Sequence, residues 1–339
     1  MPIGLCSKNW SGWKQRQKPE KNNMMTEPLV YLRGEMVPAS QARLQIYDAG
    51  VVLGATVTEM VRTFKHQLFR LQPHLDRLAR GIKYLRFDIG MEMSRLGEIC
   101  QELTAHNSRL ISAEDELGLV IFITPGELPV YAGGAGATAH NTPTVCVHTF
   151  PMPFELWSEK FRTGQHFVTP SIRHVPPQCY DPNMKYRSRM HYYLADQEAK
   201  LVDPAAAALL LDLDGNVTET GGANFLMVEK GTIVSPTLRN ILPGVSRAVV
   251  RELAGKLDIP FVEKDFAAFH ALNADEAFTA STPYCILPVT RLNGLPVGKG
   301  VPGPIFQKLI EGWNKEVGLD VIEQFCAGAS RRTGAAAKA

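Results

Sequence analysis

Glu219 and the segment that begins at Val245 are the first places in this sequence where chemistry could be carried out. Glu219 stands beside a Thr220-Gly221-Gly222 bend, where the backbone can approach a ligand closely. After Pro243-Gly244 the apolar residues take a helical period, which predicts a helix starting at Val245. Free N–H groups and the dipole at a helix N-terminus attract an anion. A carboxylate and an anion site on one strand-rich platform suggest binding of a phosphorylated molecule with a basic ring nitrogen.

Lys185 supplies the amine that such a site would need for covalent chemistry. It lies in the segment from Asp181 to Arg189, directly after a Pro182-Asn183 turn. A neutral lysine amine can form a Schiff base with an aldehyde, and burial favours the neutral form. Taken alone, however, a lysine is more often a solvated surface charge.

With Lys185 added to Glu219 and the segment at Val245, the sequence resembles the fold-type IV pyridoxal-phosphate enzymes. This group includes the branched-chain aminotransferases, the D-amino-acid aminotransferases and the aminodeoxychorismate lyases. The resemblance covers about Tyr31 to Phe325, and its sharpest motifs are the lysine segment, Glu219 to Asn224, Leu242 to Arg247, and Ser281-Thr282 with Pro288-Val289. It implies an α+β fold of two domains, one small and one larger, barrel-like and bearing helices. It also implies pyridoxal 5'-phosphate as cofactor and a homodimer.

The resemblance assigns a role to each matched residue. Lys185 would carry the cofactor as a Schiff base and move a proton, and Glu219 would keep the pyridine nitrogen protonated. Asn224 completes the family's spacing from Glu219, although simple turn chemistry would equally explain an asparagine there. The expected phosphate ligands are Arg77, Val245, Ser246 and Thr282.

The residues expected on the substrate side depart from the relatives. Read as a strand, the segment from Val51 to Phe64 places Thr58, Met60 and Arg62 on one face. The branched-chain pattern has Phe at Thr58 and Gly at Met60, and only Arg62 agrees. The arginines that other members use elsewhere are missing. Arg62 is therefore the expected anchor for the substrate carboxylate, unless it forms an ion pair at the edge of the core.

Three functions remain open on these residues. The favoured one is an aminotransferase that moves an amino group between an amino acid, branched-chain preferred, and a 2-oxo acid. An aminodeoxychorismate-type lyase that releases pyruvate and a D-amino-acid aminotransferase are alternatives of the same family. A non-catalytic cofactor-binding protein is disfavoured, because a binder needs no electron sink.

Composition limits the broader class. The 339 residues are 45% hydrophobic and 21% charged, with a formal net charge of +2. This balance, without charge blocks, gives no argument for nucleic acid. Six scattered cysteines without metal spacing fit a reducing cytoplasm, and no apolar run reaches the ~20 residues of a membrane helix. Small-molecule substrates are the expected partners, and no metal is expected.

The same pass along the chain predicts its domain boundaries. Residues 1–27 are expected to form a disordered extension, and residues 28–150 a small α+β domain. Residues 151–155, which contain Pro151-Met152-Pro153, would be a linker to the cofactor-binding domain at 156–326. The Ala/Gly/Arg-rich stretch 327–339 lacks core residues and is expected to be disordered. A Gly-rich loop is expected between Gly126 and Thr142.

Overall fold

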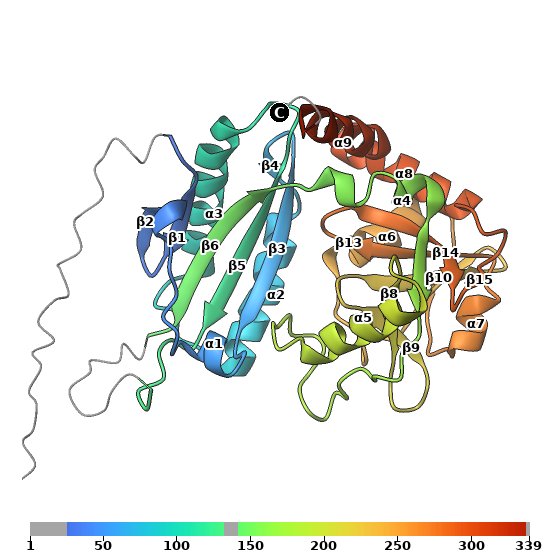
Figure 1. Ribbon diagram of the computed structural model, residues 1–339, viewed down its shortest axis with the longest axis horizontal. Coiled ribbons are helices and arrows are strands. Elements are labelled where there is room, and N and C mark those ends of the chain that lie inside the picture. Colours follow the sequence, from blue (N-terminus) through green and yellow to red (C-terminus); the bar gives the residue numbers. More distant parts are fainter. Residues whose placement is uncertain (1–25, 132–141, 337–339) are drawn as a thin grey trace, which may run out of the picture.

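The structure, a computed structural model, describes residues 26–131 and 142–336. The expected extension lies almost wholly outside the described residues, as do positions 132–141 of the Gly-rich loop. The described chain forms two sheets that lie side by side and are joined after Pro151 (Figure 1). This is the two-domain α+β architecture that the sequence predicts.

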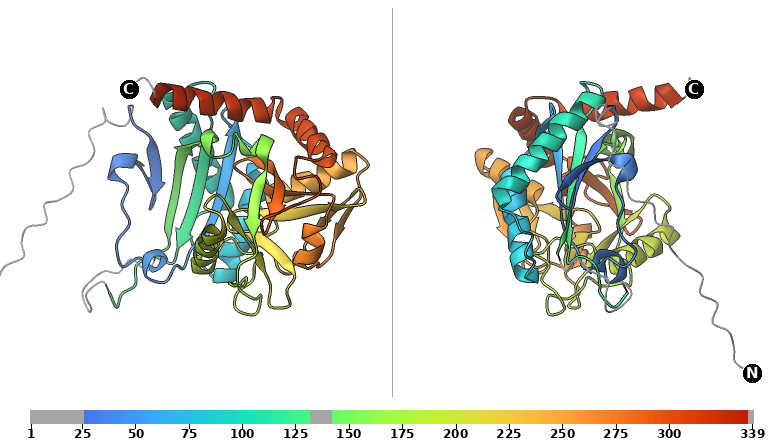
Figure 2. Two further views of the ribbon diagram at one scale, coloured as in Figure 1. Left: turned by 45° about the vertical axis from the view of Figure 1, so that its right-hand side comes forward. Right: turned by 90° about the vertical axis from the view of Figure 1, so that its left-hand side faces the viewer.

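The first domain is built on a six-stranded sheet. Its strands follow the order β2-β1-β6-β5-β3-β4, and helices α2 and α3 lie together along one face (Figure 2). Its elements are β1 (Leu29–Leu32), β2 (Glu35–Pro38), η2 (Ala39–Gln41), α1 (Ala49–Val52), β3 (Val57–Phe64), β4 (Gln67–Leu68), α2 (Leu71–Leu85), α3 (Met93–Asn107), η3 (Ser108–Leu110), β5 (Leu117–Thr124) and β6 (Thr144–Pro151).

Alternation along β3 decides which face each side chain occupies. Val57 and Val61 are buried in the core between the sheet and helices α2 and α3. The intervening Thr58 and Met60 face the other way, toward the second domain, where Met60 packs against the larger core. One face of this sheet therefore helps to form the cleft between the domains.

The second domain contains a nine-stranded sheet, which β7 and β8 join by parallel pairing. Helices α6 and α8 pack against it over a core that includes Phe278 and Trp313. Its elements are η4 (Phe154–Leu156), α4 (Lys160–Thr163), β7 (Gln165–Val168), α5 (Met190–Val202), β8 (Ala207–Leu211), β9 (Val217–Thr220), β10 (Asn224–Glu229), β11 (Thr232–Ser235), α6 (Val245–Lys256), β12 (Phe261–Glu263), α7 (Ala268–Leu272), β13 (Glu276–Ser281), β14 (Cys285–Leu292), β15 (Leu295–Pro296), α8 (Pro304–Val317) and α9 (Val321–Ala336).

Two sequence predictions need correction. The segment from Val51 does not begin as a strand, because Asp48 caps helix α1 by accepting a hydrogen bond from Gly50 N at 2.8 Å. The stretch from residue 327 is not disordered as far as Ala336, since α9 continues through it. Phe325 anchors this helix against Phe154, with ring centroids 4.9 Å apart, and alanine favours its continuation.

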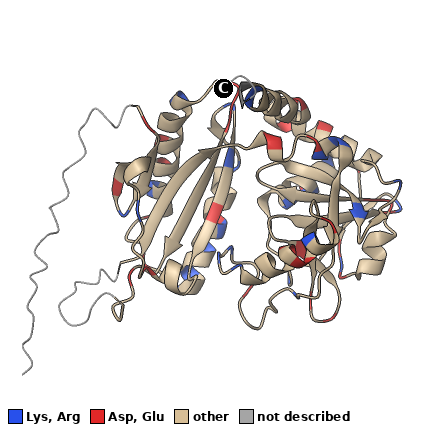
Figure 3. Ribbon diagram, viewed as in Figure 1, with Lys and Arg blue, Asp and Glu red and all other residues tan. Residues whose placement is uncertain are grey.

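Charged residues are interspersed over both domains rather than gathered on one (Figure 3). In the part of the chain that the structure describes, no helix has the length and apolar character needed to cross a membrane.

Candidate active site

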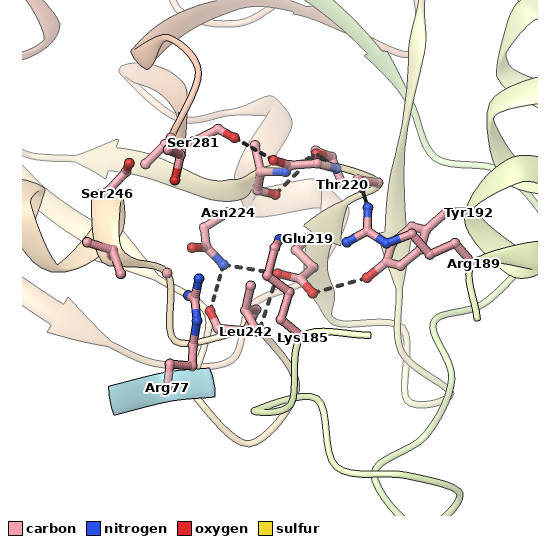
Figure 4. Close-up of a pocket in the computed structure, with 17 residues that line it drawn as sticks. Arg77, Lys185, Arg189, Tyr192, Glu219, Thr220, Asn224, Leu242, Ser246 and Ser281 are labelled. Atoms are coloured by element: carbon pink, nitrogen blue, oxygen red, sulfur yellow. Dashed lines mark hydrogen bonds between the residues drawn. The ribbon is translucent and has the colours of Figure 1, made fainter. Parts of the chain in front are cut away.

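A pocket between the domains brings most of the predicted site residues together. Its empty volume, together with the solvent at its opening, is about 420 Å³. Arg77 reaches it from α2 of the first domain, whereas the other lining residues come from the second (Figure 4). Those that the sequence predicted are Lys185, Glu219, Asn224, Val245, Ser246 and Thr282.

Lys185 is held in place by its backbone. Its carbonyl accepts a hydrogen bond from Thr58 N at 2.9 Å, so the lysine segment runs beside β3. Burial lowers the pKa of Lys185 to about 7, and the charges of Arg189 and Arg77 act in the same direction. The amine is therefore largely neutral above about pH 7, as a nucleophilic lysine requires.

Glu219 is fixed by hydrogen bonds to both carboxylate oxygens. Asn224 Nδ2 and Leu242 N donate to Oε2 at 3.0 and 3.2 Å. The hydroxyl of Tyr192 donates to Oε1 at 3.0 Å. Asn224 Nδ2 also donates to Leu242 O at 2.9 Å, so this side chain links the carboxylate to the loop before α6. Such a set of donors orients the carboxylate within the pocket.

The tight bend after Glu219 is organised by Thr220. Its Oγ1 accepts hydrogen bonds from Gly222 N and Ala223 N at 3.2 and 2.9 Å. A Cβ added at Gly222 would meet no atom within 4 Å, so the second glycine faces open space. The backbone here is accessible to a ligand, as the sequence predicts.

Two backbone segments form the end of the pocket opposite Tyr192 and Arg189. Helix α6 begins at Val245, and Ser246 lies in its first turn, where N–H groups have no acceptor within the helix. Ser281 and Thr282 line the same end from the strand β13 and the turn that follows it. A Cβ at Gly244 would overlap Asn224 Oδ1, which explains why this position is glycine. The arrangement suits an anion.

Arg77 is oriented by a buried carboxylate. Its Nε and Nη2 donate to the two oxygens of Glu59, both at 2.7 Å, and Nη1 donates to Pro243 O at 2.8 Å. His74 Nδ1 lies 2.8 Å from Glu59 Oε2. Burial would raise the pKa of Glu59, but Arg77 and then His74 outweigh it and lower that pKa to about 2. The ion pair thus ties β3 and α2 to the loop before α6.

The predicted substrate side chains do not line this pocket, and Arg62 needs correction. The residue is 1% exposed, and its guanidinium donates to Thr63 O, Pro283 O and Gln324 Oε1 at 3.1, 2.9 and 2.8 Å. It also stacks on the Phe64 ring at 3.9 Å. Arg62 is therefore a buried core residue rather than a free receptor for a carboxylate.

Thr58 and Met60 have other surroundings than expected. Thr58 Oγ1 donates to Ile121 O at 2.7 Å and accepts from Arg187 Nε at 3.3 Å. Met60 packs against the core of the second domain. They share the predicted face of β3, but packing between the domains occupies much of it.

Sequence reasoning missed Tyr192, Arg189 and His174. Tyr192 and Arg189 line the pocket, and His174 Nε2 lies 2.9 Å from the Tyr192 hydroxyl. A helical period along α5 places Tyr192 on the buried face with Ala195 and Ala199, a signal that was available. No sequence signal pairs His174 with it.

The sequence of this chain matches one family model, described as amino-transferase class IV, over residues 56–292. The chain belongs to the class IV aminotransferase family. This confirms the family predicted from the lysine and Glu219 motifs.

Individual class IV relatives agree with this assignment. The branched-chain-amino-acid aminotransferase-like protein 1 of Arabidopsis thaliana is 28% identical over 289 residues, covering 85% of this chain and 50% of that protein. The D-alanine aminotransferase of Staphylococcus haemolyticus is 26% identical over 294 residues, covering 85% and 97%. The chain thus spans half the length of the first relative and nearly all of the second.

A solved structure extends the class IV likeness to the fold. The T.th. branched-chain amino acid aminotransferase with pyridoxamine 5'-phosphate superposes with a TM-score of 0.77 at 26% identity, covering 86% of this chain and 95% of that one. The fold-type IV prediction is confirmed. Because the family is one of aminotransferases, the protein is an enzyme of that class, and neither the lyase nor the non-catalytic alternative is favoured.

Proposed function

We propose that the protein uses pyridoxal 5'-phosphate to move an amino group between an amino acid, branched-chain favoured, and a 2-oxo acid. The observation that carries this proposal is the convergence of Lys185, Glu219 and the N-terminus of α6 on one pocket. The residues fit the cofactor's three recognition groups: an amine for its aldehyde, a carboxylate for its ring nitrogen, and an anion site for its phosphate. Bound there, pyridoxal 5'-phosphate supplies an aldehyde and an electron-accepting ring.

Each of the pocket residues has a defined task in this proposal. Lys185, neutral above about pH 7, would hold the cofactor covalently through its aldehyde carbon. When the substrate amine takes over that bond, the released lysine amine would carry the proton to and from the substrate α-carbon. Glu219 holds a proton on the ring nitrogen, and Asn224 and Tyr192 orient Glu219.

The phosphate would lie at the other end of the pocket. The backbone N–H groups of Val245 and Ser246 and the Ser246 hydroxyl would bind it, with Thr282 on the opposite side. Arg77 supplies positive charge nearby, while its pairing with Glu59 keeps the guanidinium in position.

A branched-chain amino donor is proposed from the names of the relatives and from the apolar side chains of the cleft. The solved neighbour and the Arabidopsis relative are named for branched-chain amino acids. The cleft face of the first sheet carries Val120 and Phe122 beside Met60, which suits an apolar side chain. A D-alanine enzyme is also among the relatives, so stereochemistry must be part of the test.

A donor panel tests the function directly. Purified protein with cofactor should form glutamate from L-leucine and 2-oxoglutarate. Lys185→Ala should abolish this activity, and the exposed Lys200→Ala should retain it. Faster turnover of D-alanine would assign the D-amino-acid alternative, and pyruvate release from aminodeoxychorismate without an oxo-acid acceptor would assign the lyase.

We also propose a homodimer whose contact includes α1 and the loop after Gly126. Apolar side chains crowd this end of the first domain, with Ile46, Leu53 and Val130 exposed to 83%, 63% and 79%. A patch of this kind is typical of protein contacts. Sedimentation at micromolar concentration should give a dimer, and a fully active monomer would contradict the proposal.

A cytoplasmic location is part of the proposal. The five cysteines in the described ranges are all unpaired, as expected in a reducing compartment. Fractionation of cells that produce the protein would test this location.

A further inference from the structure

Arg187, two residues after Lys185, is a cation close to the active site. Among the described residues, no carboxylate lies within 4.0 Å of its guanidinium, whereas Arg77 at the same site is paired with Glu59. Its side chain is exposed, yet the surrounding protein, together with Arg189, lowers the pKa of Arg187. An exposed guanidinium that no carboxylate pairs with can bind the carboxylate of a ligand.

The guanidinium is held in a fixed orientation against the first domain. Arg187 Nε donates to Thr58 Oγ1 at 3.3 Å, and the guanidinium carbon lies 5.7 Å from the centre of the Phe122 ring. Because Thr58 uses its own proton on Ile121 O, its oxygen is committed to accepting from Arg187. Neither Nη atom has a hydrogen-bond partner among the described residues, so the fork that binds a carboxylate is free.

Arg187 lies against the face of the first sheet that is turned toward the cleft. Register pairs Thr58 with Phe122, and Phe122 with Cys146, in one row across the sheet. His148 lies on the same face of the sheet, two residues after Cys146. Burial lowers the pKa of His148, and the charge of Arg187 lowers it further. His148 is thus neutral near pH 7 and can share a carboxylate with Arg187 as a hydrogen-bond donor.

The distance to Lys185 suits an amino acid. Arg187 follows Lys185 by two residues in a segment that pairs with β3 through Tyr186 and is therefore extended. The Cα atoms of Lys185 and Arg187 are consequently at most about 7 Å apart. Arg187 and Arg189 also line an open, mostly apolar groove with Leu53, Tyr180 and Tyr193, and Arg189 belongs to the Lys185 pocket as well. The groove and the pocket therefore meet at Arg189.

We propose that Arg187 binds a carboxylate of the substrate, the role that the sequence predicted for Arg62. The guanidinium of Arg62 is already hydrogen-bonded within the core. This inference rests on the proposed aminotransferase function and names its substrate-binding residue. The carboxylate is either the α-carboxylate of every amino acid or the distal one of a dicarboxylic partner such as 2-oxoglutarate.

Binding of unreactive carboxylic acids shows whether Arg187 binds the α-carboxylate or the distal carboxylate. The enzyme with its cofactor would be titrated calorimetrically with 4-methylpentanoate, which has one carboxylate, and with glutarate, which has two. Arg187→Met should raise the Kd for both acids about tenfold or more if the α-carboxylate is bound, since it removes a charged hydrogen-bond pair. If the distal carboxylate is bound, only the Kd for glutarate should rise.

Controls distinguish this inference from the function on which it rests. Arg251→Met, an exposed change on α6, should leave both Kd values unaltered, and Arg187→Lys should restore binding only in part because an ammonium lacks the fork. Cofactor absorbance and melting temperature should match the wild type in Arg187→Met. If the wild type transaminates and Arg187→Met leaves both Kd values unchanged, the role of Arg187 is overturned but the proposed function is not. A wild-type protein that neither fixes the cofactor on Lys185 nor transaminates would overturn the proposed function.

Discussion

The hydroxyl of Tyr192 donates a hydrogen bond to Oε1 of Glu219 over 3.0 Å and lies 2.9 Å from Nε2 of His174. This contact joins helix α5, which follows the lysine segment, to the strand that carries the carboxylate. It also means that Glu219 is oriented from both sides, since Asn224 and Leu242 N act on the other oxygen.

Two substitutions separate the charge of Glu219 from its orientation. Glu219→Gln should slow turnover roughly 100-fold or more, because an amide cannot hold a proton on the ring nitrogen, a loss on the scale of single electrostatic catalytic groups. Tyr192→Phe removes only one of several hydrogen bonds and should cost about tenfold or less. Steady-state kcat, with cofactor content measured by absorbance, would check both. A loss in Tyr192→Phe as large as in Glu219→Gln would show that the tyrosine does more than orient the carboxylate.

Covalent trapping identifies the reacting lysine. Borohydride reduction of the protein with its cofactor should fix the cofactor on Lys185, which is the lysine that lines the pocket in the described part of the chain. Peptide mass spectrometry would locate the label, and Lys185→Ala should abolish it. Label on any other lysine would contradict the assignment.

The lowered pKa of Lys185 predicts how the cofactor-free protein responds to pH. Burial, Arg189 and Arg77 lower that pKa from 10.5 to about 7 in the folded state. Between these values the unfolded chain binds more protons at this residue than the folded chain does. The contribution of Lys185 to the free energy of unfolding must therefore rise with pH from about 7 to about 10.5.

Urea titrations at several pH values would measure this contribution. The difference in stability between wild type and Lys185→Met should change across that window in favour of the wild type at high pH. The rate of covalent attachment of pyridoxal 5'-phosphate should reach half its maximum near pH 7. A midpoint near the ordinary lysine value would mean that the amine is not buried as described.

Glu59 should matter for stability as well as for activity. Glu59→Gln leaves the buried Arg77 without its carboxylate and should destabilise the protein by roughly 3–5 kcal/mol. It should also weaken cofactor binding, because Arg77 loses the partner that positions it. Denaturation and cofactor titration would check both effects, with the exposed Glu311→Gln as the matched control. Wild-type stability in Glu59→Gln would contradict a buried ion pair.

Arg62 should behave as a core residue. Arg62→Met leaves Pro283 O and the Gln324 side chain without their donor and should lower stability by roughly 1–3 kcal/mol. The KM for the amino donor should stay near the wild-type value in the folded fraction. A large rise in KM without a change in melting temperature would restore Arg62 as the carboxylate anchor.

The sequence by itself determined the local parts of the site. The Thr-Gly-Gly bend beside Glu219, the helix start at Val245 and the turn before Lys185 are each set by a few consecutive residues, so their residue types reveal them. The element that follows them was predicted for the same reason, and α6 begins at Val245 as expected. Strand alternation also showed which β3 side chains share a face.

Only the tertiary structure decided what covers that face. The partners of Arg62 lie 221 and 262 positions away along the chain, at Pro283 and Gln324, and no pattern around Arg62 announces them. Arg187 meets Thr58 from 129 positions away, and no described residue accepts a hydrogen bond from its Nη atoms. Periodicity reports the direction in which a side chain points, whereas packing between distant segments determines whether an arginine there becomes a buried donor or a free cation.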